Sequence, residues 1–393
     1  MTPPAPLRVP PYGRRTVGDL MASLLHGLGV DGFPNPLGLD ACARVCVLVV
    51  DGLGWELVRA HAEAAPFLNQ AAGRQAPVSA GFPSTTTASM GSFGTALPPG
   101  AHGLVGYTFA LPGAARALNT IGWRWSGQPP SDDLRETIVP ERLQPHPTVF
   151  ERAAASGVAV TRFGPAAFSD SGLTRAAQRG GTFRSVVGLG DLVDQGVAAL
   201  SAAPRSLVWL YHGDLDGIGH VYGVNSEGWR VQLGLVDAFV AALAARLPAD
   251  ALLVVTADHG MVDVPASAMI DLDVASELAA GVRLLGGEPR ARYVYARPGA
   301  AADVLATWQS VLGERAWVLA REQAIAAGLF GPRVTAEARS RIGDVVVLAR
   351  EPIGVVQRSV DPGIARLIGQ HGSATAAEQL VPALFIGSGA GGS

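Results

Sequence analysis

The chain of 393 residues contains no lysine, so all 30 of its Lys and Arg positions are arginine. Against 33 acidic residues this gives a net charge of −3 at pH 7. No basic excess is present that would attract nucleic acid as a standing partner. An anionic ligand must therefore be bound by arginine, by backbone amides or by a metal ion.

Cysteine and long apolar runs are also scarce. Cys42 and Cys46 are the only cysteines, which is too few for a disulfide framework, and we predict free thiols. No stretch approaches the roughly 20 apolar residues that a membrane-spanning helix requires. The N-terminal residues contain arginines without the apolar core of a signal peptide. We therefore predict a soluble cytoplasmic protein with no membrane partner.

The apolar residues that are present predict an α/β fold. Hydrophobic residues make up 48% of the chain. They form runs typical of buried strands at 44–50, 206–211 and 251–256, separated by segments of helical spacing. This alternation predicts a mostly parallel central sheet covered by helices on both faces. Residues 266–340 break the alternation, which predicts an inserted cap subdomain within a single domain of residues 1–393.

Acidic and imidazole side chains follow these strand-like runs. Asp51 comes directly after the first run, Asp216 and His220 come shortly after the second, and Asp258 and His259 follow the third. In open α/β sheets the carboxyl ends of parallel strands meet at one edge, where ligands bind. We therefore expect these side chains to lie close together.

Two further segments complete the set. His371 lies in a late Gln-His-Gly turn, and three threonines, Thr85 to Thr87, open a segment that has the pattern of a helix N-terminus. Three Asp and three His suit zinc or a similar divalent ion, and six such ligands are enough for two ions. Two divalent ions can bind the attacking and leaving oxygens of a displacement at phosphorus, and one can activate a threonine hydroxyl.

This ordered set resembles the alkaline phosphatase superfamily, and within it the type I phosphodiesterase/nucleotide pyrophosphatase family. The resemblance spans about 45–260 and 340–387, and it implies an alkaline phosphatase-like fold with two zinc ions. The implied ligands are Asp216, His220 and His371 for one ion, and Asp51, Thr86, Asp258 and His259 for the other. Thr86 is also the implied nucleophile, with its neighbour Thr85 as the alternative.

Two residues are predicted to contact the substrate. Where the resemblance leads us to expect an asparagine three residues after the nucleophile, this chain has Ser89, whose hydroxyl would hold a phosphoryl oxygen. Tyr107 belongs to an aromatic, glycine-rich passage at 97–127. That passage is interpreted either as a wall of the substrate pocket or as a flap packed on the core.

We predict a metal-dependent phosphodiesterase or nucleotide pyrophosphatase. It would hydrolyse a nucleotide-like, small-molecule phosphate diester through a phospho-threonine intermediate that water then releases. Diesters are favoured over monoesters because no lysine exists and no arginine closely follows the threonines, although Arg290 or Arg292 could fold over the site. Two alternatives stay open: a phosphomonoesterase or phosphonate hydrolase on the same scaffold, and an inactive metal-dependent protein that binds a phosphate ligand.

Overall fold

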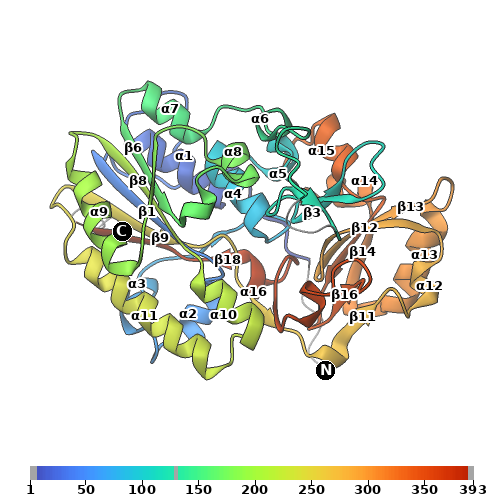
Figure 1. Cartoon of the computed structure of the whole chain (residues 1–393). Coiled ribbons are helices and arrows are strands. Elements are labelled where there is room, and N and C mark those ends of the chain that lie inside the picture. Colours follow the sequence, from blue (N-terminus) through green and yellow to red (C-terminus); the bar gives the residue numbers. More distant parts are fainter. Residues whose placement is uncertain (1–6, 128–131, 388–393) are drawn as a thin grey trace.

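The computed structural model describes residues 7–127 and 132–387, and its centre is a six-stranded sheet (Figure 1). In spatial order the strands are β19 (Ala383–Gly387), β9 (Ala251–Thr256), β1 (Arg44–Val50), β8 (Ser206–His212), β6 (Ala159–Gly164) and β7 (Thr182–Ser185). All neighbours in this sheet are parallel except β19, which is antiparallel to β9. The predicted fold class is confirmed.

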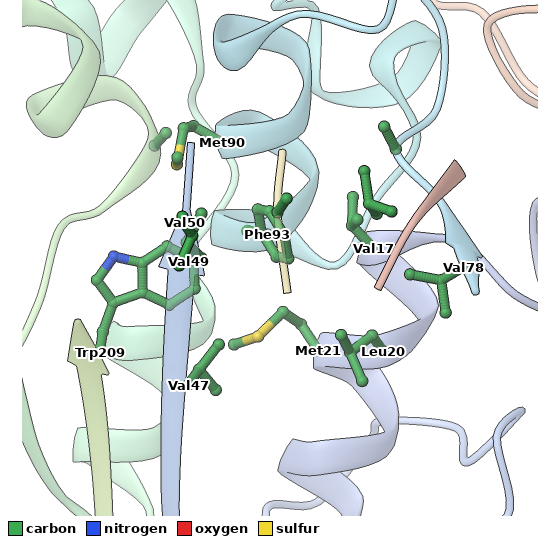
Figure 2. Close-up of a cluster of buried hydrophobic side chains, with 14 of the residues drawn as sticks. Val17, Leu20, Met21, Val47, Val49, Val50, Val78, Met90, Phe93 and Trp209 are labelled. Atoms are coloured by element: carbon green, nitrogen blue, oxygen red, sulfur yellow. The ribbon is translucent and has the colours of Figure 1, made fainter. Parts of the chain in front are cut away.

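Helices cover both faces of the sheet (Figure 1). One face carries α1 (Val17–Gly27), α4 (Thr86–Thr95), α7 (Val149–Ala155) and α8 (Gly172–Ala177), and the other carries α3 (Pro66–Ala72), α9 (Leu189–Ser201) and α11 (Glu227–Ala244). Between α4 and the sheet, Phe93 meets the Trp209 ring edge-on at 5.3 Å, above the valines of β1 (Figure 2). This apolar layer fixes the start of α4 against the carboxyl edge of the sheet.

One predicted element is divided. Residues 55–72 have helical spacing throughout, but the structure has two helices, α2 (Trp55–Ala60) and α3, because Pro66 begins the second one. Proline has no N–H to donate and is favoured at the first position of a helix rather than inside it. Cys42 and Cys46 are both unpaired, as predicted.

A second lobe contains a four-stranded antiparallel sheet with its own core. In spatial order its strands are β12 (Val282–Glu288), β13 (Ala291–Ala296), β15 (Val345–Ala349) and β14 (Ala316–Ala320), with α13 (Ala301–Leu312) packed against them. Trp308 and Val294 are fully buried in this core. The strand β15 lies after residue 340. The second lobe therefore extends beyond residues 266–340, the segment predicted as an insert.

The remaining elements flank these two parts or connect them. They are α2, β2 (Val78–Ser79), α5 (Pro99–His102), β3 (Thr108–Ala110), β4 (Ala117–Asn119), β5 (Arg124–Trp125), α6 (Pro140–Leu143), α10 (Asp214–Tyr222), β10 (Val262–Asp263), β11 (Met269–Asp271), α12 (Ser276–Ala279), α14 (Arg321–Ala326), α15 (Ala336–Arg341), β16 (Gly354–Val356), β17 (Gly369–Gln370), α16 (Ala376–Gln379) and β18 (Leu380–Val381). Short 3-10 turns lie at Ala166–Phe168, Ala266–Ala268, Gly313–Arg315 and Ile364–Arg366. Within the described residues, no helix has the length and apolar character needed to cross a bilayer.

Candidate active site

The site lies at the carboxyl edge of β1, β8 and β9. Asp51 is the first residue after β1, while Asp258 and His259 directly follow Ala257 at the end of β9. The chain leaves β1 sharply at Gly52, whose φ is +72°. A Cβ at Gly52 would lie 3.1 Å from Asp216, so glycine both permits this turn and lets two acidic residues approach.

The first group of side chains is Asp216, His220 and His371, whose nearest nitrogen and oxygen atoms all lie within 4.8 Å of one another. Asp216 and His220 are four residues apart on α10 and therefore share one face of that helix. His220 Nε2 lies 3.3 Å from Asp216 Oδ2. His371 follows β17, far along the chain.

The second group is Asp51, Asp258 and His259, and it is buried. His259 Nε2 lies 3.2 Å from Asp51 Oδ1 and 3.6 Å from Asp258 Oδ2. The two groups adjoin, because the rings of His259 and His371 stack with centroids 3.5 Å apart. The six Asp and His residues among the seven predicted metal ligands are thus brought together in the two expected sets.

The three imidazoles share an orientation that suits a metal ion. In each ring Nδ1 faces a backbone carbonyl, an arrangement that suits the tautomer in which Nδ1 keeps its proton and Nε2 binds a metal ion. The pairs are His220 with Gly369 at 2.8 Å, His259 with Gly260 at 3.0 Å and His371 with Ser84 at 2.9 Å.

The carboxylates need a cation. Among the described residues, one buried oxygen on each of Asp51, Asp216 and Asp258 has no hydrogen-bond partner. Burial and the neighbouring Asp51 raise the pKa of Asp258 to about 7, and the same causes raise the pKa of Asp216. For Asp51, burial is outweighed by the hydrogen bond and charge of His259, so its pKa is lowered. Uncompensated carboxylates beside free Nε2 atoms are a donor set for divalent metal.

Thr86 is the hydroxyl that reaches this centre. It is the first residue of α4, after the N-cap Thr85, and its Oγ1 lies 3.2 Å from His259 Nε2. Thr87 is turned away, because its hydroxyl is buried against that of Thr120 at 2.7 Å. The start of α4 is also fixed to the loop that carries His371, since the Ser84 N–H donates to the Gly372 carbonyl at 3.1 Å.

Ser89 does not fit its predicted role as a substrate contact. Its side chain is fully buried, and its hydroxyl donates to the backbone carbonyls of Asp258 at 2.5 Å and Ala80 at 3.3 Å. One turn into α4, the helix already packs on the end of β9. Ser89 therefore positions the Asp258 backbone rather than a phosphoryl oxygen.

The aromatic passage divides between the two interpretations that the sequence left open. Tyr107 lines the cavity beside the site, and its hydroxyl accepts a hydrogen bond from Asn119 at 2.7 Å. Phe109 and Trp123 are buried in the core. The passage is thus mostly a packed flap, with Tyr107 and Ile121 contributing to the cavity wall.

Two side chains at the site escaped the sequence reasoning. The Tyr211 hydroxyl, at the end of β8, donates to Asp51 Oδ2. Glu288, at the end of β12, brings a buried carboxyl from the second lobe to within 3.7 Å of His371 Nδ1. Tyr211 ends an apolar run and Glu288 lies in a distant strand, so neither carried a local signal of function.

The two arginines that could have folded over the site, Arg290 and Arg292, have partners elsewhere. Arg290 forms a buried ion pair with Glu378 at 2.7 Å and also donates to backbone carbonyls. Arg292 donates to the carbonyls of Val355 and Gly287. Neither lines the cavity that contains Thr86.

That cavity has a volume of about 410 Å³ and runs from the two groups of ligands along the sheet. Its reactive end is formed by Asp51, Thr86, Asp216, His220 and His371. The rest of its wall is largely apolar and aromatic, as is usual for a small-molecule site. The apolar wall residues include Met90, Phe163, Phe168, Leu173, Phe183 and Trp209.

A comparison with protein families matches residues 45–374 to type I phosphodiesterase/nucleotide pyrophosphatase. The chain belongs to this family. The family is one of hydrolases that use divalent metal, which agrees with the donor set described above. A comparison with curated protein sequences found no match.

Solved structures show the same fold. Murine ectonucleotide pyrophosphatase/phosphodiesterase 5 matches with a TM-score of 0.66 and 18% identity over 88% of both chains. The human protein of the same name matches with a TM-score of 0.66 and 17% identity over the same shares. A murine variant with the same score, 17% identity and the same coverage is described as inactive through a threonine-to-alanine change and as bound to AMP.

Proposed function

We propose that this member of the family is a two-metal phosphodiesterase that acts through Thr86 on a nucleotide-like diester. The observation that carries the proposal is the position of the Thr86 hydroxyl, 3.2 Å from His259, beside two adjoining three-residue groups of metal-binding side chains. The inactive threonine-to-alanine variant of the murine relative, with AMP bound, supports both the residue type of the nucleophile and the substrate class.

The metal ions would be held by the two groups, with zinc the ion that best suits mixed carboxylate and imidazole ligands. Asp216, His220 and His371 would bind one ion, and Asp51, Asp258, His259 and the Thr86 oxygen the other. When bound, such a pair supplies Lewis-acid stabilisation of the charge that develops on the oxygens at phosphorus.

The chain's own groups determine the course of the reaction. Thr86 Oγ1 gives its proton to solvent and attacks phosphorus, a P–O bond to Thr86 forms, the P–O bond to the leaving group breaks, and the departing oxygen takes up a proton from solvent to give the alcohol. Water then attacks the phospho-threonine, restoring the Thr86 hydroxyl and releasing a monoester. The free N–H groups at the start of α4 face the negative charge of the phosphoryl group. Two displacements give overall retention at phosphorus.

A diester is favoured over a monoester by the groups around Thr86. A monoester dianion needs an additional cation beside phosphorus, but Arg290 is committed to Glu378 on α16 and Arg292 to the Val355 carbonyl. Glu288 instead brings a further carboxyl to this wall of the cavity. Burial raises the pKa of Glu288 to about 8.

The test compares kcat/KM of the zinc-loaded protein on bis-p-nitrophenyl phosphate and on p-nitrophenyl phosphate. We expect a strong preference for the diester, and loss of that activity by at least about 10³-fold in Thr86→Ala with metal binding retained. Thr85→Ala serves as the matched control and should keep turnover. A preference for the monoester would overturn the diesterase assignment, and turnover by Thr86→Ala would move the nucleophile elsewhere.

A further inference from the structure

The cavity contains a buried arginine that the catalytic scheme does not use. Arg162, on β6, lines the same cavity as Thr86 but is only 7% exposed. Its Nε donates to the Gly180 carbonyl at 2.9 Å, whereas its Nη1 has no hydrogen-bond partner among the described residues. It makes no ion pair within the described chain, and its other neighbours are the rings of Phe150 and Phe183.

A second unpaired donor lies next to it. Arg162 and Trp209 are partners in the register of β6 and β8, so their side chains lie on the same face of the sheet. Trp209 also lines the cavity, is 1% exposed, and its indole Nε1 has no acceptor among the described residues. In Figure 2 this nitrogen lies on the side of the indole away from Phe93.

Two adjacent buried donors without acceptors are costly in a folded protein. Each donor has lost its hydrogen bonds to water without gaining an acceptor in the protein, and an unpaired buried charge costs more than an unpaired neutral donor. Burial lowers the pKa of Arg162 to about 10, which reflects the same cost. Carboxylates elsewhere on the cavity wall belong to the reactive end or to the second lobe. An anionic group that enters the cavity would therefore find an unpaired donor at Arg162.

The position of this pair excludes a role at the reacting phosphorus. Trp209 is level with Val47 of β1, so Asp51 lies four residues nearer the carboxyl edge, about 13 Å along the strand. β6 and β1 are separated by one strand, which adds about 10 Å across the sheet. The apolar side chains of Phe168 and Leu173 also line this cavity.

We propose that Arg162 and the Trp209 indole N–H form a subsite for an anionic group, a carboxylate or a phosphate, at the far end of the substrate's retained ester group. This inference rests on the proposed function, because it takes the reacting phosphoryl group to be bound at Thr86. The substrate class is then a phosphodiester with an apolar or aromatic middle portion and a second negative charge. Charge rather than a neutral acceptor is required, since only an anion compensates the buried guanidinium.

The experiment uses three diesters with a common p-nitrophenolate leaving group. The retained ester is a biphenyl-4-ylmethyl group that carries a 4′-carboxylate, a 4′-phosphonate or a 4′-methyl group, so that the substrates are long enough to reach the subsite and differ only in the distal group. We expect the zinc-loaded wild type to prefer at least one charged diester in kcat/KM by about 10- to 100-fold, as for a charge-assisted hydrogen bond. The better of the two charged substrates then tells whether the subsite takes a carboxylate or a phosphate.

The variants assign that preference to the subsite. Arg162→Met should reduce the ratio of charged to uncharged substrate to about one, and Trp209→Phe should reduce it in part. Arg184→Met is the matched control, because Arg184 is exposed on the adjoining strand β7 and does not line the cavity; it should leave the ratio unchanged. Arg162→Met should also keep or raise the melting temperature of the ligand-free protein, since it removes an uncompensated charge.

Binding separates failure of the subsite from failure of the proposed function. Titration calorimetry of the three diesters against Thr86→Ala measures binding without turnover. Tighter binding of a charged diester than of the uncharged one, lost when Arg162→Met is added, supports the subsite even if no diester is hydrolysed. Absence of hydrolysis in the wild type would overturn the proposed function alone. Equal binding of all three diesters would overturn the subsite. So would a lower melting temperature of Arg162→Met together with an unchanged preference for the charged diester.

Discussion

Replacing Asp258 with asparagine is expected to stabilise the metal-free protein while weakening its response to zinc. Burial and Asp51 raise the pKa of Asp258 to about 7 from an ordinary value of 3.8. A folded-state pKa that is raised means that the folded protein binds the proton more tightly than the unfolded chain does. The cost of ionising Asp258 is therefore absent below about pH 4, grows as the pH rises, and reaches about 4 kcal/mol above pH 7.

Asparagine removes this cost without removing the local hydrogen bonds. Asp258 Oδ1 accepts from the N–H groups of Gly52 at 3.3 Å and His259 at 3.1 Å, and an asparagine Oδ1 can accept both. At pH 8.5 we expect the variant to gain up to about 4 kcal/mol in the free energy of unfolding, falling to about 1–2 kcal/mol at pH 5. Asp51 raises the pKa of Asp258 and His259 lowers it, so part of the cost depends on these two neighbours. The value of about 4 kcal/mol is therefore an upper bound.

The assay is urea unfolding of chelator-treated protein at the two pH values, repeated with zinc. Asp237→Asn is the matched control, because Asp237 is also a buried aspartate but accepts from the N–H groups of Phe67 and Leu68 at the start of α3. It should destabilise the protein with or without zinc. The reasoning would be refuted if Asp258→Asn lowered the stability of the metal-free protein at pH 8.5 as Asp237→Asn does.

Three further substitutions test the roles assigned to individual side chains. Tyr211→Phe removes the hydrogen bond to Asp51 and should weaken metal binding by about 10- to 100-fold in competition with a chelator; unchanged affinity would show that this hydroxyl does not tune the ligand. Ser89→Ala should cost about 1–2 kcal/mol of unfolding free energy, through the freed Asp258 carbonyl, with KM for small diesters unchanged; a large rise in KM would restore Ser89 as a substrate contact. Arg290→Met leaves the carboxylate of Glu378 buried without its ion-pair partner, so it should lower the unfolding free energy by about 3–5 kcal/mol in denaturant melts. Loss of substrate affinity without loss of stability would instead favour a role of Arg290 in binding substrate.

The reactive end of the site could be predicted because its residues carry local signals. Asp51 and the Asp258–His259 pair follow continuous β-branched runs, and such runs are long enough to be identified as buried parallel strands. Asp216 and His220 come shortly after the run at 206–211, although the helix α10 that carries both of them was not predicted. Their convergence then follows from the rule that ligands gather at the carboxyl ends of parallel strands.

What the sequence could not provide depends on long-range packing. Ser89 lies three residues after Thr86, close to it on the helix, but only the packing of α4 on β9 shows that its hydroxyl meets the Asp258 carbonyl. Arg162 lies within a short strand and looks like a solvated residue until α7 and β7 cover it. The pairing of β15 with the second sheet likewise joins segments that are far apart in the chain.

The most direct measurement is the hydrolysis of bis-p-nitrophenyl phosphate by chelator-treated protein as zinc is added back in measured equivalents. We expect no turnover without metal, a rise to a plateau at two zinc ions per chain, and two bound ions but no turnover in Thr86→Ala. Turnover in the metal-free protein, or a plateau at one equivalent, would contradict the assignment of the two groups of ligands as a single catalytic centre.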